Sequence, residues 1–176
     1  MMQFTTRAAL AVVLTGVVLV LVSGCGMSES RKAEVVASQE VELREFIDQA
    51  DAWGADIIAQ VPAEETESIS GNAGGSRQAG DNYEQWPRYY IWHKFVELHP
   101  DGARTPTEFA DDLEPWLEEQ GWVQTREDVL PRKGTIERGY SRGGYSLMLE
   151  AYTAVPPQAQ LVALMIVTPR TNPDPQ

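Results

Sequence analysis

The chain has 176 residues and a formal net charge of −12, from 26 acidic and 14 basic side chains. This length is enough for one domain with its own core, but not for two. The acidic balance excludes a nucleic-acid-binding protein, because phosphate recognition needs clustered lysine and arginine. It also excludes a domain that adheres to an anionic membrane through charge alone.

The first 24 residues have the pattern of a secretory signal. Arg7 and the terminal amine give a positive start, residues 8–22 are uncharged, and the small residues Ser23 and Gly24 follow. This order predicts a peptide that is removed on export. The alternative is an uncleaved membrane helix, since a run of this length reaches the short limit of a membrane span.

The segment Leu21-Val22-Ser23-Gly24-Cys25 ends this signal. It resembles the lipobox of exported bacterial lipoproteins, in which an aliphatic residue and two small residues precede a cysteine. The resemblance covers only these residues and the signal, and it identifies no domain family. It implies that Cys25 carries diacylglycerol, that cleavage falls between Gly24 and Cys25, and that the protein is anchored at the extracytoplasmic face of the cell membrane. Two acyl chains give stable anchoring.

The mature chain from Cys25 onward is still more acidic, with 13 basic and 26 acidic residues and a net charge of −13. The lipid is therefore expected to hold it at the membrane. Residues 25–32 are predicted to form a short tether that keeps the domain close to the lipid. Cys25 is the only cysteine, so no internal disulfide can form. Arginine outnumbers lysine by 11 to 3, which is typical of GC-rich bacteria such as actinobacteria.

Residues 33–61 are predicted to form one long amphipathic helix. Its apolar residues recur at spacings of three and four. They are Val36, Leu43, Phe46, Ile47, Ala50, Trp53, Ile57, Ile58 and Val61. Gly54 weakens the middle by about 1 kcal/mol relative to alanine, and Pro62 ends the helix. The apolar stripe faces either the protein's own core or a partner.

Residues 62–87 are rich in Gly, Ser, Asn and Glu and have no periodicity. We expect a flexible loop here, because a segment of this length and composition lacks the apolar side chains that would order it.

Residues 88–98 follow Pro87 and are rich in aromatic and β-branched side chains, which predicts a strand. Both of its faces are apolar. One face has Tyr89, Ile91, His93 and Phe95, and the other has Tyr90, Trp92, Val96 and Leu98. Such a strand is expected inside a sheet or covered on both sides.

A second helix is predicted from Thr105, which can cap it with Pro106 at the first position and Glu108 completing a capping box. Gly121 supplies the C-terminal cap. Pro115 is expected to kink or split the helix, because proline removes a backbone hydrogen bond.

The rest of the chain has the pattern of β-structure. The predicted strands are residues 122–126, 135–141, 145–153 and 161–168, followed by a frayed tail at 169–176. The fold class is therefore α+β, with a mainly antiparallel sheet of about five strands, two helices packed on it and a cleavable signal helix before it.

Three patterns could carry chemistry. Gly139-Tyr140-Ser141-Arg142-Gly143 matches the G-x-S-x-G motif of hydrolases, but a strand follows it and no histidine comes later, so a hairpin is favoured. His93 and His99 have no metal-ligand spacing, and we expect no metal or other cofactor. The acidic residues of the second helix favour a solvated helix face over a calcium loop. They are Asp111, Asp112, Glu114, Glu118 and Glu119.

Aromatic residues gather just after the expected loop, and aromatic side chains provide large contact areas for ligands and partners. The possible binding surface comprises Tyr83, Trp86, Tyr89, Tyr90 and Trp92. The same residues could instead form part of the core.

The sequence thus favours a lipid-anchored, extracytoplasmic binding or accessory module of the cell envelope that is not an enzyme. Its partner would be an envelope protein or a small ligand, in addition to the membrane and without nucleic acid. The alternative is an envelope hydrolase that uses Ser141 or a histidine. A two-lobed solute-binding protein is disfavoured, since the single domain is too small.

Overall fold

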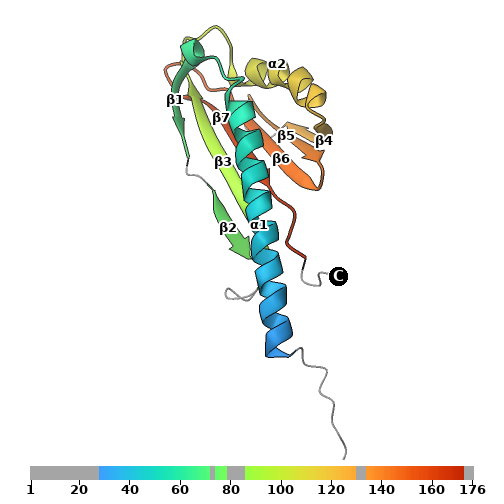
Figure 1. Ribbon diagram of the computed structural model, residues 1–176. Helices are drawn as coiled ribbons and strands as arrows, with labels where there is room; N and C mark the ends of the chain where they lie inside the picture. Colours follow the sequence, from blue (N-terminus) through green and yellow to red (C-terminus); the bar gives the residue numbers. More distant parts are fainter. Residues whose placement is uncertain (1–27, 72–73, 79–85, 130–133, 173–176) are drawn as a thin grey trace, which may run out of the picture.

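The computed structural model describes residues 28–71, 74–78, 86–129 and 134–172 (Figure 1). Its elements are α1 (Glu29–Ile58), η1 (Ala63–Glu65), β1 (Thr66–Ser70), β2 (Gly75–Gln78), β3 (Arg88–Leu98), α2 (Pro106–Glu119), β4 (Val123–Val129), β5 (Thr135–Arg142), β6 (Tyr145–Tyr152) and β7 (Gln160–Val167). This confirms the α+β class. The predicted signal and Cys25 lie outside the described residues, among which no helix is long and apolar enough to cross a membrane.

In the described residues, the strands form one sheet and all of their pairs are antiparallel. Its seven strands follow the order β1-β3-β7-β6-β5-β4, and β2 pairs with β3 beside β1. The expected number of about five strands was too low, and the prediction of a flexible loop over 62–87 was wrong for residues 66–70 and 75–78, while residues 72–73 and 79–85 lie outside the described part. β1 and β2 lie in that segment and are held by backbone pairing with β3, so they need little of the apolar alternation that makes a strand visible in a sequence.

Helix α1 is longer than predicted and starts inside the segment expected to be a tether. Ser28 caps it by accepting a hydrogen bond from the backbone N–H of Arg31 at 3.2 Å. The tether prediction for residues 25–32 was therefore wrong from Glu29 onward, because the cap and the apolar face extend the helix toward the N-terminus. Its 30 residues span about 45 Å.

Both helices cover one face of the sheet (Figure 1). α1 lies over β3, and α2 packs mainly over β6. The buried side chains of the central strands alternate toward this face, where they meet the apolar sides of the helices. They include Trp92 and Val96 of β3, Leu164 and Ile166 of β7, and Leu147 and Leu149 of β6. The packing confirms that the stripe of α1 serves the protein's own core.

Helix α2 begins with the predicted capping box. Glu108 accepts a hydrogen bond from the backbone N–H of Thr105 at 2.8 Å, and Thr105 Oγ1 accepts one from the N–H of Glu108 at 3.2 Å. Pro115 does not split the helix, which is continuous through it. Pro115 is exposed on the outer side, where water can solvate the carbonyl that loses its partner.

The C-terminal segment is ordered further than expected. Thr171 is buried, its backbone N–H donates to the Arg88 carbonyl at 2.8 Å, and its hydroxyl donates to Gln39 Oε1 at 2.8 Å. The prediction of a frayed tail was therefore wrong for residues 169–172, because these polar contacts tie the tail to β3 and α1. Residues 173–176 lie outside the described part.

Candidate functional site

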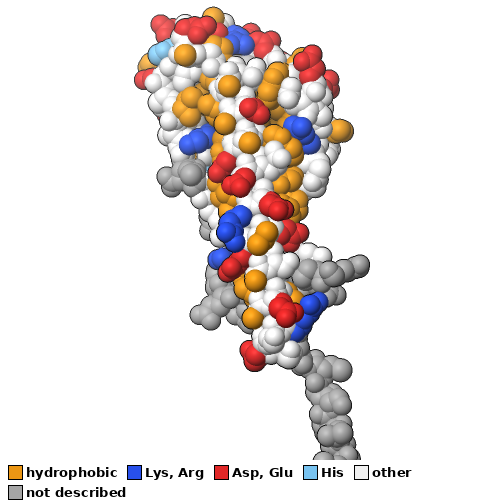
Figure 2. All heavy atoms as spheres, in the orientation of Figure 1, with side chains coloured by type: hydrophobic (Ala, Val, Ile, Leu, Met, Phe, Trp, Pro, Cys, Tyr) orange, Lys and Arg blue, Asp and Glu red, His pale blue; other side chains and the backbone are white. Residues whose placement is uncertain are grey.

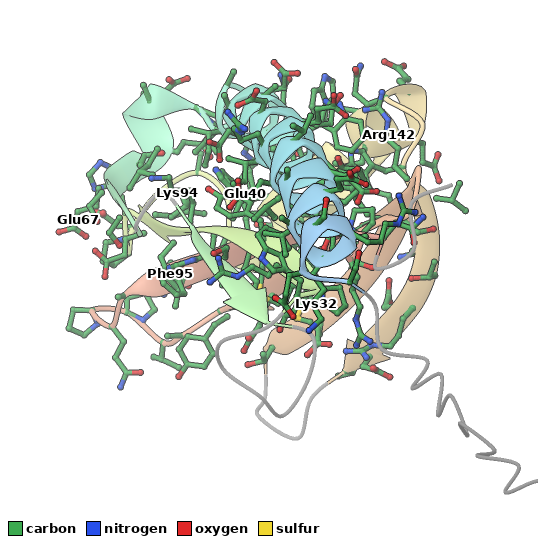
Figure 3. The ribbon with its side chains drawn as sticks, turned by 60° about the horizontal axis from the view of Figure 1, so that its bottom comes forward. Lys32, Glu40, Glu67, Lys94, Phe95 and Arg142 are labelled. Carbon is green, nitrogen blue, oxygen red and sulfur yellow. The ribbon has the colours of Figure 1, made fainter. Side chains whose placement is uncertain are left out.

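The sheet face turned away from both helices carries apolar side chains on neighbouring strands. We call it the open face and define it by Ile91, His93, Phe95, Met148, Ala163, Met165 and Val167. Phe95 is 41% exposed, and the other six are half-buried. Phe95 projects from the side of the sheet opposite α1, whereas Lys94 lies on the helix side (Figure 3).

Two shallow hollows lie side by side on the open face. The first has a volume of about 300 Å³ and lies between Phe95, His93 and Met165. The second, of about 260 Å³, extends over Gly139, Ser141 and Ser146 of the β5–β6 hairpin. Met148 and Met165 line both hollows, so the hollows adjoin at these paired methionines and together extend across β3, β7, β6 and β5. We call this the trough.

An acidic pair lies beside the trough. Glu137 of β5 is directly opposite Glu150 of β6, on the same face as Met148. Arg126 makes an ion pair with Glu137 and a second with Asp128 at 2.8 Å. Glu150 makes no ion pair within the described residues. Like charges directly opposite each other destabilise a sheet, and Arg126 offsets the charge of Glu137 but forms no ion pair with Glu150.

The opposite side of the molecule has a different surface. Acidic side chains are spread along the outer surface of α1, with apolar groups at its flanks (Figure 2). Glu34, Glu45 and Asp48 are among these exposed residues. Charged side chains keep this surface hydrated, so the open face is the better candidate for an interaction surface.

The predicted aromatic surface is divided by the pleat of β3. Tyr90 and Trp92 are buried beneath α1, and the Tyr90 hydroxyl donates to Asp51 Oδ1 at 2.8 Å. Burial and the Asp51 carboxylate raise the pKa of Tyr90. The binding prediction was therefore wrong for Tyr90 and Trp92, which belong to the core.

The other members of that aromatic group also fail to form one surface. Trp86 is half-buried against the core, with the Arg88 guanidinium 5.4 Å from its ring centroid. Tyr89 points to the same side as Ile91, by strand alternation. Tyr83 lies outside the described residues. On β3, the alternate residues Ile91, His93 and Phe95 belong to the open face, and Tyr89 lies on the same side of the strand.

Sequence reasoning missed the contribution of β6 and β7 to the open face. Residues 161–167 read Leu-Val-Ala-Leu-Met-Ile-Val and are apolar on both faces, as β3 is. Such strands are usually covered on both sides, whereas here the helices cover only one. The signal was the unbroken apolar run, but the sequence does not say which of its faces is uncovered.

The hydrolase alternative gains no support from the geometry. Ser141 lies on β5 and His93 on β3, and the strands β6 and β7 lie between them. Their backbone partners run from Ser141 through Ser146 and Val167 to Ile91, which is two residues from His93. Three strand spacings of about 4.8 Å separate Ser141 from β3, so Ser141 and His93 cannot share a hydrogen bond.

The other candidate centres also have structural explanations. The residues of the G-x-S-x-G match form the end of β5 and a hairpin turn, as predicted. His99 follows β3 and accepts the backbone N–H of Gly102 through its carbonyl at 3.0 Å. In the described part of the chain, no group of histidine, cysteine and carboxylate side chains could hold a metal ion.

Of the five acidic residues expected on a solvated face of α2, Asp111, Asp112, Glu118 and Glu119 are exposed, as expected, and Glu114 is half-buried. Three of the five also form ion pairs, which the sequence did not indicate. Asp112 binds Arg104 at 2.8 Å, while Asp111 and Glu114 bind the buried Arg138 at 2.5 and 3.2 Å. Arg138 also binds Glu127 of β4 at 2.9 Å. The carboxylates Asp111 and Glu127 raise the pKa of Arg138 against the opposing effect of burial. This network attaches α2 to β4 and β5.

Tyr140 lies next to Arg138 and is buried, and its hydroxyl makes no hydrogen bond within the described residues. Burial and the nearby Glu114 raise the pKa of Tyr140 to about 12. A raised phenol pKa favours the neutral folded form, so its contribution to stability is complete below about pH 10 and is lost as the pH rises through about 12.

Tyr140→Phe is expected to leave the free energy of unfolding at neutral pH unchanged or to raise it by up to about 1 kcal/mol, because an unsatisfied buried hydroxyl is removed. The variant should also lose less stability than the wild type between neutral pH and about pH 11. Urea unfolding at the two pH values measures both effects. An equal alkaline loss in the two proteins would contradict the assignment to Tyr140.

No protein-family model, no curated protein and no solved structure matches this chain at a significant level. The open face, the trough and the acidic pair are therefore the features from which a function can be inferred.

Proposed function

We propose that the protein is a lipid-anchored binding module of the extracytoplasmic cell envelope and that its open face is the binding surface. The supporting observation is that β3 and β7 are apolar on both faces while the helices cover only one. Apolar surface in water is unfavourable, and a contiguous patch on a small domain marks an interaction site. The two methionines add side chains that can adapt to a partner's shape.

The proposed anchor and helix α1 together set the position of the open face. The helix cap at Ser28 comes three residues after Cys25. The N-terminal end of α1 extends past the strands (Figure 1). A chain acylated at Cys25 would thus carry its sheet on a helical stalk, further from the lipid than the short tether suggested.

Cys25→Ala is expected to move the protein from the membrane fraction to the soluble extracytoplasmic fraction, or to leave it as an unprocessed precursor. The wild type extracted from membranes should begin at Cys25 and carry the mass of a diacylglycerol. Cell fractionation and intact-protein mass spectrometry test this. A wild-type protein that keeps residues 1–24, or that lacks the lipid mass, would contradict the anchor.

The binding surface is tested by photo-crosslinking in intact cells. A benzophenone amino acid at Phe95 should form adducts with one or a few proteins. The same group at Val41, on the outer surface of α1, should not. These positions make a matched pair, because their side chains are 41% and 51% exposed. No adduct from Phe95, or the same adducts from both positions, would count against the open face.

A further inference from the structure

The open face combines an apolar trough with a carboxylate, Glu150, that has no ion-pair partner among the described residues. We propose that it binds a basic amphipathic helix of another protein, with the partner's apolar side chains over the trough and a lysine or arginine against Glu150. This inference rests on the proposed binding function and specifies the chemistry of the partner.

The dimensions of the trough fit one helix. It crosses four strands, or three spacings of about 4.8 Å, and so extends about 14 Å across them. A helix of about 10–12 Å diameter lying along the strands would cover most of this width. The small side chain of Ala163 lowers the floor beside Phe95. The small side chains of Ser141 and Ser146 and the bare backbone of Gly139 lower it on the side toward β5. An amphipathic helix recognised in a groove presents an apolar stripe of this width.

The charges favour a basic partner. Glu150 makes no ion pair within the described residues, and its cross-strand neighbour Glu137 shares Arg126 with Asp128. A partner cation near Glu150 would offset the repulsion between the two carboxylates. The mature chain's net charge of −13 would also speed the approach of a basic segment.

The same features disfavour other occupants. A second copy of the chain would bring two more opposed glutamates and another −13 of net charge to the contact. A small apolar ligand would stay largely in water, because the trough is open along its length, whereas ligand sites usually bury about 70–90% of a ligand's surface.

The test uses the full lipidated chain in nanodiscs of zwitterionic lipid and a fluorescent synthetic helix of about 18 leucine and lysine residues, long enough for about five turns. Its twin has glutamate in place of every lysine. Fluorescence anisotropy, with empty nanodiscs subtracted, should show binding of the leucine–lysine helix at least about tenfold tighter than that of the twin.

Two pairs of variants locate the bound helix. Phe95→Ser should weaken binding of the leucine–lysine helix by about tenfold, whereas Val41→Ser should leave the affinity unchanged. Glu150→Gln should weaken binding several-fold, whereas Glu118→Gln on the exposed surface of α2 should leave it unchanged. Glu150→Gln should also raise the melting temperature by about 1–2 °C, since it removes a like-charge pair. Its weaker binding therefore could not be attributed to unfolding.

Several results would overturn the inference. One is equal affinity for the leucine–lysine helix and its glutamate twin. Another is an equal loss of affinity in Glu150→Gln and Glu118→Gln, because that result would mean that net charge alone attracts the helix. Self-association that Phe95→Ser abolishes in sedimentation would assign the face to a second copy. If photo-crosslinks form from Phe95 but the leucine–lysine helix does not bind, the basic helix is wrong while the binding function stands. If Phe95 forms no photo-crosslinks and the leucine–lysine helix does not bind, both the proposed binding function and the basic helix are wrong.

Discussion

Gly54→Ala is expected to lower the free energy of unfolding by about 2 kcal/mol, although alanine stabilises an isolated helix by about 1 kcal/mol relative to glycine. A Cβ at position 54 would lie 2.2 Å from Cε2 of Trp92 and 2.5 Å from its Cζ2. The indole is 4% exposed and sits between α1 and the sheet, so it has little room to move. The glycine that seemed only to weaken α1 is what lets the helix approach β3.

A double-mutant cycle isolates this contact. Trp92→Phe removes Cζ2 and the outer part of the indole that a Cβ at position 54 would meet, so Gly54→Ala should cost less in that background. Urea unfolding of the four proteins gives the coupling energy. The same cost for Gly54→Ala in both backgrounds would show that the packing against Trp92 is not responsible.

Arg138→Met is expected to lower the free energy of unfolding by about 2–3 kcal/mol. The substitution leaves Asp111, Glu114 and Glu127 close together without the cation that joins them. Breaking a fully buried ion pair costs about 3–5 kcal/mol, but the Asp111 and Glu127 side chains are 55% and 46% exposed and can be partly solvated. The loss should be greatest at low salt, where repulsion among the three carboxylates is least screened.

Arg104→Met is the matched control, because Arg104 also joins two carboxylates, Glu65 and Asp112, but has a side chain that is 26% exposed rather than 9%. Arg104→Met is expected to lower the free energy of unfolding by about 1 kcal/mol. Chemical unfolding of both variants at two salt concentrations makes the comparison. If Arg138→Met cost no more than Arg104→Met, the network would not be what holds α2 on the sheet.

The parts of the fold that could be predicted are those whose signal is local. β3 has the predicted bounds, because a dense run of aromatic and β-branched residues follows Pro87. α2 begins where Thr105 and Glu108 form their capping box. β1 and β2 could not be predicted, since their order comes from pairing with β3 rather than from their own side chains.

The open face depends on long-range packing, which is why only part of it could be predicted. The alternation in β3 separates Ile91, His93 and Phe95 from Trp92 and Val96 at the level of sequence. The set that faces the helices depends on which side of the sheet α1 packs against. The close approach at Gly54 lets α1 pack against the side that carries Trp92. Grouping the aromatics by proximity in sequence therefore mixed core residues with surface residues.

Oxidation of Met148 and Met165 tests most directly whether the open face is occupied in the cell. Both methionines line the trough. Peroxide labelling followed by mass spectrometry gives their oxidation rates in intact cells and in the purified protein in liposomes. A bound partner predicts that both methionines oxidise several-fold more slowly in cells, and that Phe95→Ser restores the faster rate. Equal rates in cells and in liposomes would contradict the proposal that the open face is the binding surface.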